Sequence, residues 1–185
     1  MSLEEDIIAK SNTSQSEAKK IVLHFDELSL KKKDILHKRG EVCSKYFFLK
    51  SGLLRFSFQQ GEKDETAWIV FENTFFTDIF SLYDNKPSFF EILAIENSIV
   101  YCISKDKLEN LIILFPVLQK YLRNTWEYNF RSIAEIKLLQ QFGDAKMRYN
   151  FLLKNKKWMK RVPQKLLASF IGITPYSLSR IRRNS

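Results

Sequence analysis

The stretch from Pro116 to Gln141 most limits how this chain can fold, because it contains no glycine or proline after its first residue. Its apolar residues recur at helical spacing and predict one helix of about 26 residues, roughly 39 Å long at 1.5 Å per residue. A helix of that length extends beyond the face of a small domain. It therefore needs a second surface to cover it, and the same helix of a second copy is a natural candidate.

One stripe of this predicted helix has heptad-like spacing. It consists of Leu118, Leu122, Thr125, Asn129, Ser132, Ile136 and Leu139. The polar members of this stripe fit a seam that sets the register between two helices better than they fit a dry core. A second stripe widens the predicted buried face and consists of Tyr121, Trp126, Phe130 and Ile133. We expect a dimerisation helix; the alternative is a helix that packs only on its own domain.

The residues before this helix have a different composition. Segments 46–49, 53–58, 66–71 and 98–103 are short and rich in aromatic and β-branched residues, and turn-prone pieces separate them. Many short strands at this spacing predict a sandwich or a barrel. After Ser104, a predicted helix cap, the apolar period lengthens and predicts a short helix. Before the strands, residues 14–25 predict a short amphipathic helix, with Ser14 and Glu17 spaced as a capping box. We therefore expect an α+β fold in which the strands lie between this helix and the later helices.

The net charge of +9 belongs to one end of the chain. Residues 144–185 carry eleven Lys and Arg against one acid, whereas residues 1–143 carry 19 against 20. A compact basic module beside a near-neutral one predicts a nucleic-acid-binding domain next to a domain with a different function.

The basic end contains the spacing of a helix-turn-helix unit. Counting Gln164 as the first position, the residues at positions five, nine, fifteen and eighteen are Ala168, Gly172, Leu178 and Ile181. A small residue lets two helices approach closely, and glycine adopts the left-handed conformation that a tight turn needs. Thr174 and Pro175 suit the cap and the first position of a second helix. This spacing is typical of DNA-binding helix-turn-helix units.

The second helix of this unit presents a polar face when Leu178 and Ile181 face the first helix. The residues expected to reach base edges are Tyr176, Ser177 and Arg180, of which Arg180 is the best candidate for a bidentate contact to guanine. The residues expected to contact phosphates are Ser179, Arg182, Arg183, Lys156, Lys157, Lys160, Arg161 and Lys165. The alternative is an effector-binding sensor or adaptor whose basic tail binds protein or an anionic surface.

Other function classes lack their signatures in this sequence. It contains no Ser-His-Asp or Cys-His arrangement, phosphate-cradling glycine loop or metal-spaced cluster, so we expect neither an enzyme nor a metal site. No apolar run approaches the ~20 residues that span a bilayer, and the N-terminus lacks an apolar signal region. Cys43 and Cys102 are expected to be buried thiols in a reducing compartment. We therefore expect a cytoplasmic protein.

From about Leu28 onward the chain resembles the Crp/Fnr family of bacterial transcription regulators. The residues that match the opening strands of the family are Gly40-Glu41, Tyr46–Leu49 and Lys50–Arg55. The closing strand of the family's barrel and the helix after it are matched by ENSIVYCISKDKLENLI. The family's recognition segment is matched by LASFIGITPYSLSRIRRN. The resemblance implies a β-roll, a jelly-roll-like barrel for sensing, at residues 1–115. It implies a dimerisation helix at 116–141 and an all-α helix-turn-helix domain at 142–185. Because the sequence ends at Ser185, we expect the β-wing of many relatives to be absent.

The same resemblance bears on the effector. Family members that bind cyclic nucleotides carry a Gly-Glu pair and, about ten residues later, an Arg followed by Ser or Thr; here Thr77-Asp78 and Ser88-Phe89 occupy these places. Because a buried phosphate without a cation is costly, we expect no cAMP or cGMP binding by the usual mode. The four-cysteine pattern of the iron–sulfur members is also absent, so we expect no cofactor. The residues expected to line a pocket for another effector are Asp78, Ser88, Phe89, Phe90 and Trp68. The alternative is that the aromatic residues form plain barrel core.

Taken with the resemblance, the sequence predicts a homodimeric, sequence-specific DNA-binding regulator. As partners we expect double-stranded DNA and a second copy of the chain, with RNA polymerase as a further candidate and no membrane. The two recognition helices of the dimer would enter successive major grooves about one helical turn apart.

Overall fold

The computed structural model describes residues 1–155 and 157–183, and it describes only the backbone of Leu139, Phe142, 154–155 and 157–158. The N-terminal helices are α1 (Leu3–Ser11) and α2 (Gln15–Val22). The strands are β1 (Asp26–Leu30), β2 (Ile35–His37), β3 (Lys45–Ser51), β4 (Leu53–Gln60), β5 (Lys63–Phe71), β6 (Thr74–Phe76), β7 (Glu91–Ala94) and β8 (Ser98–Ser104), with α3 (Ile79–Asp84) between β6 and β7. The later helices are α4 (Lys105–Leu114), α5 (Val117–Phe142), α6 (Ala145–Asn155), the 3-10 helix η1 (Lys157–Arg161), α7 (Gln164–Ile171) and α8 (Pro175–Arg183).

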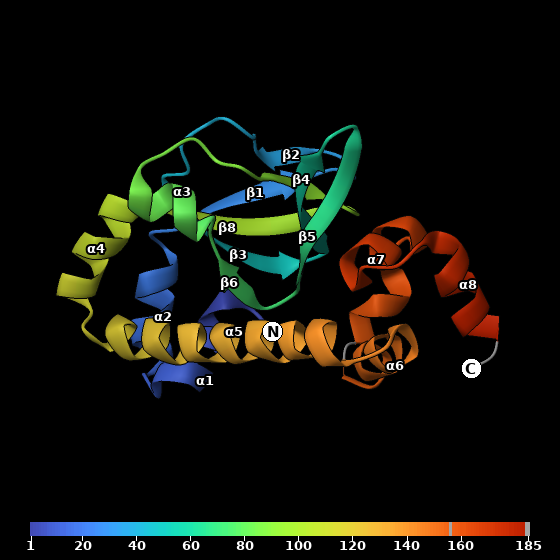
Figure 1. The fold of residues 1–185 in the computed structure, drawn as a ribbon. Helices are drawn as coiled ribbons and strands as arrows, with labels where there is room; N and C mark the ends of the chain where they lie inside the picture. The colour runs from blue at the N-terminus through green and yellow to red at the C-terminus, as the bar shows by residue number, and fades with distance from the viewer. Residues whose placement is uncertain (156, 184–185) are drawn as a thin grey trace.

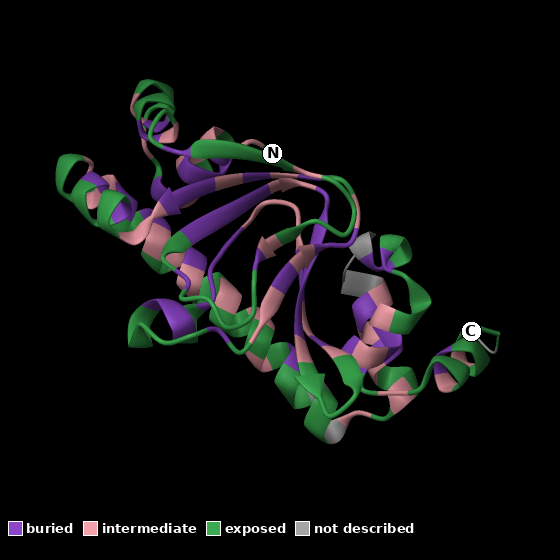
Figure 2. Cartoon of the chain, turned by 90° about the horizontal axis from the view of Figure 1, so that it is seen from above, coloured by how far each residue is buried: buried purple, intermediate pink, exposed green. Residues whose placement is uncertain are grey.

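The strands form two four-stranded antiparallel sheets that face each other as a barrel. Their strand orders are β1-β8-β3-β6 and β2-β7-β4-β5. Apolar side chains from both sheets meet between them, among them Leu49, Leu54, Val70, Ile92 and Val100. Figure 2 shows how much of these strands is buried. The α+β fold expected from the sequence, with a β-roll ahead of the long helix and the C-terminal helices, is confirmed.

A second core lies on the outer face of the sheet that contains β3. Tyr46 and Phe48 alternate along β3 with two residues that face the barrel interior, so this strand is buried on both faces. Helices α1, α2, α4 and the first half of α5 cover this outer face, and the Tyr121 hydroxyl of α5 donates to the Asp6 carboxylate of α1 at 2.9 Å. The N-terminal helices therefore hold α5 against the barrel.

The long helix expected after Pro116 is present as α5, an uninterrupted helix of 26 residues. Figure 1 shows that it runs beneath the barrel from α4 to the C-terminal helices. In its middle, the Asn129 side chain donates to the carbonyl of Phe75 in β6 at 3.0 Å. Residues 145–155 and 157–183, which we call the head, lie at the far end of α5 beside β5 (Figure 1).

Candidate nucleic-acid interface and effector groove

Helices α7 and α8 form a helix-turn-helix unit with the turn that the sequence predicts. Gly172 follows α7 with a φ of +77°, and its N–H donates back to the carbonyls of Ala168 and Ser169. The Thr174 hydroxyl accepts from the N–H of Ser177 at 3.1 Å and so caps α8. Leu178 of α8 is fully buried in the core of the head. These contacts fix the angle between the two helices and leave the opposite face of α8 free.

The outward face of α8 is basic, and no acid of the head neutralises it. Tyr176 is 77% exposed, and Arg180 is exposed beside it. The predicted phosphate-contacting residues that are also exposed are Ser179, Arg182, Arg183, Lys160, Arg161 and Lys165. No Asp or Glu occurs between residues 145 and 185. Lys156 and the side chain of Lys157 lie outside the described residues.

Two of the predicted DNA-contacting residues on α8 have structural partners as well. The Ser177 hydroxyl is hydrogen-bonded to that of Thr174 at 3.0 Å, within the α8 cap. Arg182 donates through Nε to the Tyr149 hydroxyl of α6 at 3.2 Å and lies over the same ring. Arg180 therefore remains the exposed cation best placed on the leading face of α8.

The head contacts the barrel through α7, which periodicity and spacing did not predict. The Ser169 hydroxyl accepts from the backbone N–H of Thr66 at 2.7 Å and donates to the Glu65 carboxylate at 2.6 Å. The ring of Phe170 meets that of Trp68 edge to face, 5.9 Å between centroids. Because these partners are about one hundred residues apart in sequence, no local pattern in the sequence could indicate the contact. Trp68, predicted only as a pocket residue, therefore also contacts the head.

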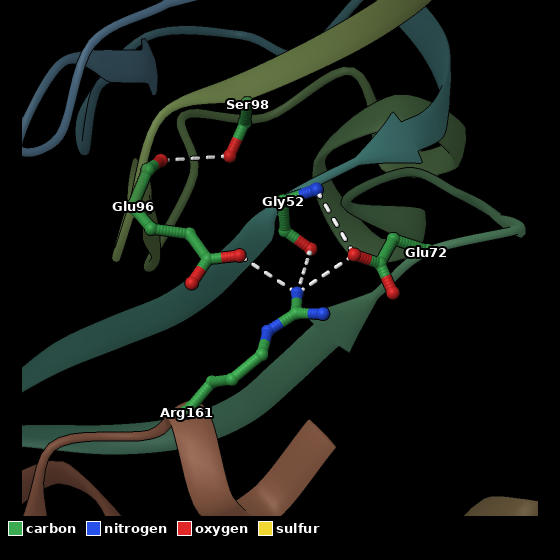
Figure 3. A network of polar contacts seen from close by, with 5 residues as sticks. All are labelled: Gly52, Glu72, Glu96, Ser98 and Arg161. Atoms are coloured by element: carbon green, nitrogen blue, oxygen red, sulfur yellow. Dashed lines mark hydrogen bonds and ion pairs between the residues drawn. The ribbon is translucent and has the colours of Figure 1, made fainter. Parts of the chain in front are cut away.

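Arg161 differs from its predicted role as a phosphate contact because acids of the barrel already hold it. One guanidinium nitrogen lies 2.7 Å from a carboxylate oxygen of Glu72, 2.7 Å from one of Glu96 and 3.2 Å from the carbonyl of Gly52, as Figure 3 shows. The hydrogen bond to Glu72 is the main reason why the pKa of Arg161 is raised. Arg161 therefore links the head to three loops of the barrel.

Gly52 shapes this ion-pair site through its backbone. Its φ is +101°, and a Cβ at this position would lie 2.2 Å from the Ser98 hydroxyl oxygen and 2.7 Å from the Ser98 Cα. Only glycine fits such a conformation at such close range. The absent side chain lets the Gly52 carbonyl and the Glu96 loop converge on Arg161 (Figure 3).

A groove of about 480 Å³ lies between the barrel, α3 and α5, and we call it the α5 groove. The residues that line it are Phe56, Ala67, Trp68, Phe71, Thr74, Phe76, Thr77, Asp78, Ile79, Phe80, Phe90, Trp126, Tyr128, Asn129, Phe130, Ser132 and Ile133. Of the predicted pocket residues, Asp78, Phe90 and Trp68 line this groove. Phe89 is 62% exposed and lines a neighbouring hollow of about 320 Å³ instead. Ser88 lines neither of these two spaces.

Asp78 and Ser88 bind each other across the place that the family resemblance assigns to a nucleotide. The Ser88 hydroxyl donates to one Asp78 carboxylate oxygen, while the other accepts from the N–H of Ser81 at 3.3 Å and caps α3. Ser88 also accepts from the N–H of Phe90 at 3.0 Å. Both residues are buried, at 2% and 4% exposed. The pair thus satisfies itself and extends no cation toward a ligand.

The predicted seam of α5 faces the interior of its own chain. Leu118 and Thr125 are each 1% exposed and Ile136 is 9% exposed, whereas Leu122, Asn129 and Ser132 are half-buried and the Leu139 side chain lies outside the described residues. Tertiary packing buries this stripe, because α1 and α2 pack around Leu118 and the head packs around Ile136.

The apolar side chains that α5 exposes lie outside the predicted seam, at several positions around the helix. They are Tyr128, Phe130, Ile133 and Leu138. Phe130 and Ile133, from the stripe that was expected to widen the buried face, are 72% and 50% exposed. The face of α5 that is open to a partner is therefore offset from the predicted seam.

Three further observations concern chemistry and membranes. Cys43 and Cys102 are buried, unpaired thiols, as expected. Among the described residues, no group of three or more His, Cys, Asp or Glu is arranged to hold a metal ion. Within the same residues, no helix combines the length and the apolar character required to cross a bilayer.

Comparison with known proteins gives one family match and many structural matches. Residues 27–113 match the cyclic nucleotide-binding domain family, and no curated protein matches the sequence. A CooA double mutant from Carboxydothermus hydrogenoformans is 18% identical, with a TM-score of 0.73 over 100% of this chain and 84% of that one. FixK2 from Bradyrhizobium japonicum is 17% identical, with a TM-score of 0.69 over 86% and 83%. The catabolite activator protein of Thermus thermophilus is 16% identical, with a TM-score of 0.60 over 97% and 85%.

Proposed function

Because residues 27–113 belong to the cyclic nucleotide-binding domain family and the chain has the fold of the Crp/Fnr regulators, we propose that this protein is a homodimeric, sequence-specific DNA-binding transcription regulator. The observation that carries this proposal is the exposed basic face of α8 on a capped helix-turn-helix unit. On this proposal α8 enters the major groove with Tyr176 and Arg180 toward the base edges. The exposed lysines and Arg183 contact phosphates and supply most of the salt-dependent affinity.

Selection from a randomised duplex library at physiological salt tests the proposal. A dimeric reader enriches an inverted repeat whose half-site centres lie about 10 base pairs apart. Retention of DNA without enrichment of any sequence would contradict sequence-specific recognition and favour the adaptor alternative.

Two alanine variants then separate base reading from general charge. Arg180→Ala is expected to cost about 1–3 kcal/mol at one base position and to relax the preference there. Lys160→Ala, the matched loss of one exposed cation, is expected to weaken binding to all sequences equally and to lower the salt slope by about one. If both variants behave like Lys160→Ala, α8 does not read bases.

The dimer of this proposal uses the exposed face of α5. A second copy would cover Phe130 and Ile133, whose large apolar side chains otherwise face water. Phe130→Glu is expected to convert a dimer to a monomer in sedimentation velocity, with the circular dichroism spectrum unchanged. Glu135→Gln, an exposed residue about 140° around the helix from Phe130, is the control. A Phe130→Glu protein that remains dimeric contradicts this interface.

Cyclic nucleotides are not the effectors on this proposal. Its support is the Asp78–Ser88 pair, in which a hydroxyl stands where the resemblance places an arginine, and the lining of the α5 groove, which contains no Lys or Arg. Isothermal titration with cAMP and cGMP is expected to give no heat of binding up to millimolar ligand, and micromolar binding of either would contradict it.

A further inference from the structure

The loop between β1 and β2 carries three consecutive lysines, Lys31–Lys33, and we call it the lysine loop. All three are exposed. The one acid beside them in the loop is Asp34, whose carboxylate accepts from the backbone N–H of Lys31 at 2.8 Å. Within the described part of the chain, none of the three lysines forms an ion pair. A concentrated positive charge therefore lies on the part of the chain that is near neutral as a whole.

The backbone of the lysine loop is fixed against the turn between β7 and β8. The N–H of Lys32 donates to the side-chain oxygen of Asn97 at 2.9 Å, and the N–H of Lys33 donates to the carbonyl of Ala94 at 2.8 Å. Lys33 has a φ of +78°, a conformation that a residue other than glycine keeps only where the surrounding structure holds it. The three lysines therefore project from a rigid base.

The turn that holds the lysine loop also contacts the head. Glu96 of this turn lies 2.7 Å from the guanidinium of Arg161, and Ile95 packs into the core of the head. Figure 1 shows that this end of the barrel faces α7. The lysine loop therefore lies at the end of the barrel nearest the head, and its position relative to the head is set by these contacts.

The lysine loop is within reach of a duplex held by α8. A head of about 40 residues is roughly 20–25 Å across, and one turn of DNA is about 34 Å long. A duplex that continues for about one turn beyond the half-site is therefore long enough to reach the loop when it bends toward the barrel. The cost of such bending is offset by the additional contacts that it permits.

We propose that the lysine loop binds phosphates of the DNA that flanks the half-site held by the head of the same chain. This inference rests on the proposed function, because the loop meets flanking DNA only when α8 holds a duplex. An ammonium group binds phosphate as a point charge and reads no base. The loop therefore adds affinity and favours bent DNA without adding sequence preference.

Two duplexes of different length test this inference. Both contain the inverted repeat enriched in the library selection; the short one ends at the outer edges of the half-sites, and the long one continues for about 15 base pairs, one and a half turns, on each side. The protein is expected to bind the long duplex at least about tenfold more tightly, with a salt slope steeper by about 2–5, because each phosphate contact adds about 0.9 to the slope and a dimer presents two loops.

Two triple variants locate the contact. Replacement of all three lysines of the loop by glutamine is expected to leave affinity for the short duplex unchanged, which also shows that the variant is folded. Its affinity for the long duplex is expected to fall to that for the short one, and hydroxyl-radical protection of the flanks is expected to disappear. The matched control is Lys19→Gln/Lys20→Gln/Lys120→Gln, which removes three exposed lysines from α2 and the start of α5, away from the head (Figure 1), and is expected to keep the advantage of the long duplex.

Several results would overturn the inference. One is equal affinity of the unaltered protein for the two duplexes, and another is an advantage of the long duplex that persists in the loop variant. Equal losses in the loop variant and the control, or equal losses of the loop variant on both duplexes, would also contradict a contact to flanking DNA. Failure of the short duplex to bind better than a scrambled repeat is a separate result, which refutes sequence-specific recognition and the flanking contact with it.

Discussion

Replacement of Arg161 by methionine is expected to loosen the attachment of the head to the barrel. The Arg161 side chain is 40% exposed, and its partners Glu72 and Glu96 are 34% and 35% exposed, so each ion pair is worth only about 0.2–1 kcal/mol. The hydrogen bond to the Gly52 carbonyl adds about 0.5–1.5 kcal/mol. The total is about 2 kcal/mol, which corresponds to a roughly 30-fold shift between attached and detached heads.

One amide reports on this equilibrium. The backbone N–H of Thr66 donates to the Ser169 hydroxyl of the head, so it is protected from hydrogen exchange while the head is attached. In Arg161→Met its exchange, followed residue by residue by NMR, is expected to be roughly 30-fold faster. The N–H of Ala94, which donates to the Asp34 carbonyl within the barrel at 2.9 Å, should keep its rate.

Two further variants show whether the ion pairs cause the change. Lys165→Met removes the same charge from an exposed position on α7 and is expected to leave Thr66 exchange unaltered. In a Glu72→Gln/Glu96→Gln background, Arg161→Met should have much less effect, since the pairs are already lost. Equal acceleration by Arg161→Met and Lys165→Met, or an unchanged effect in the glutamine background, would refute the argument.

Three other changes have expected outcomes in denaturant unfolding. Gly52→Ala should lower the free energy of unfolding by roughly 3 kcal/mol or more, because the new Cβ overlaps a neighbouring backbone. Gly61→Ala should cost only about 1 kcal/mol, because Gly61 has a φ of +61° but open space around it. Similar unfolding midpoints for the two variants would contradict the clash at Gly52. Tyr121→Phe should cost about 1–3 kcal/mol because it removes the donor to the buried Asp6 carboxylate, and an unshifted midpoint would contradict that bond. Burial raises the pKa of the Cys102 thiol above its ordinary value of 9.0, so the contribution of this thiol to the unfolding free energy should be constant below about pH 9 and fall as the pH rises toward the raised pKa. Cys102→Ala should make the alkaline slope of the unfolding free energy shallower, and an unchanged slope would contradict this.

The sequence predicts the local features of the molecule well. The glycine turn after α7, the Thr174 cap and the uninterrupted α5 each depend on a few neighbouring residues, and the structure contains all three. A resemblance over most of the chain adds the order of barrel, long helix and head. These features depend on backbone preferences that a short stretch of sequence carries by itself.

Contacts between distant residues were not predictable in this way. The stripe through Leu118 was assigned to a partner helix because periodicity shows that a face is apolar but not what covers it. Its cover is α1, whose Asp6 is 115 residues from Tyr121. Arg161 likewise looked like one more cation of a basic run, and only the fold brings Glu72 and Glu96 to it.

The contact between α7 and β5 has a consequence for the protein in concentrated solution. β5 is the last strand of its sheet, so its outer row of backbone groups has no neighbouring strand, and the Ser169 hydroxyl occupies one of those groups at Thr66. An uncovered edge strand is a template on which the edge of another molecule can add. The head therefore shields the barrel from edge-to-edge aggregation. In any state in which the head leaves β5, this edge strand is exposed, and association between molecules through it increases with protein concentration.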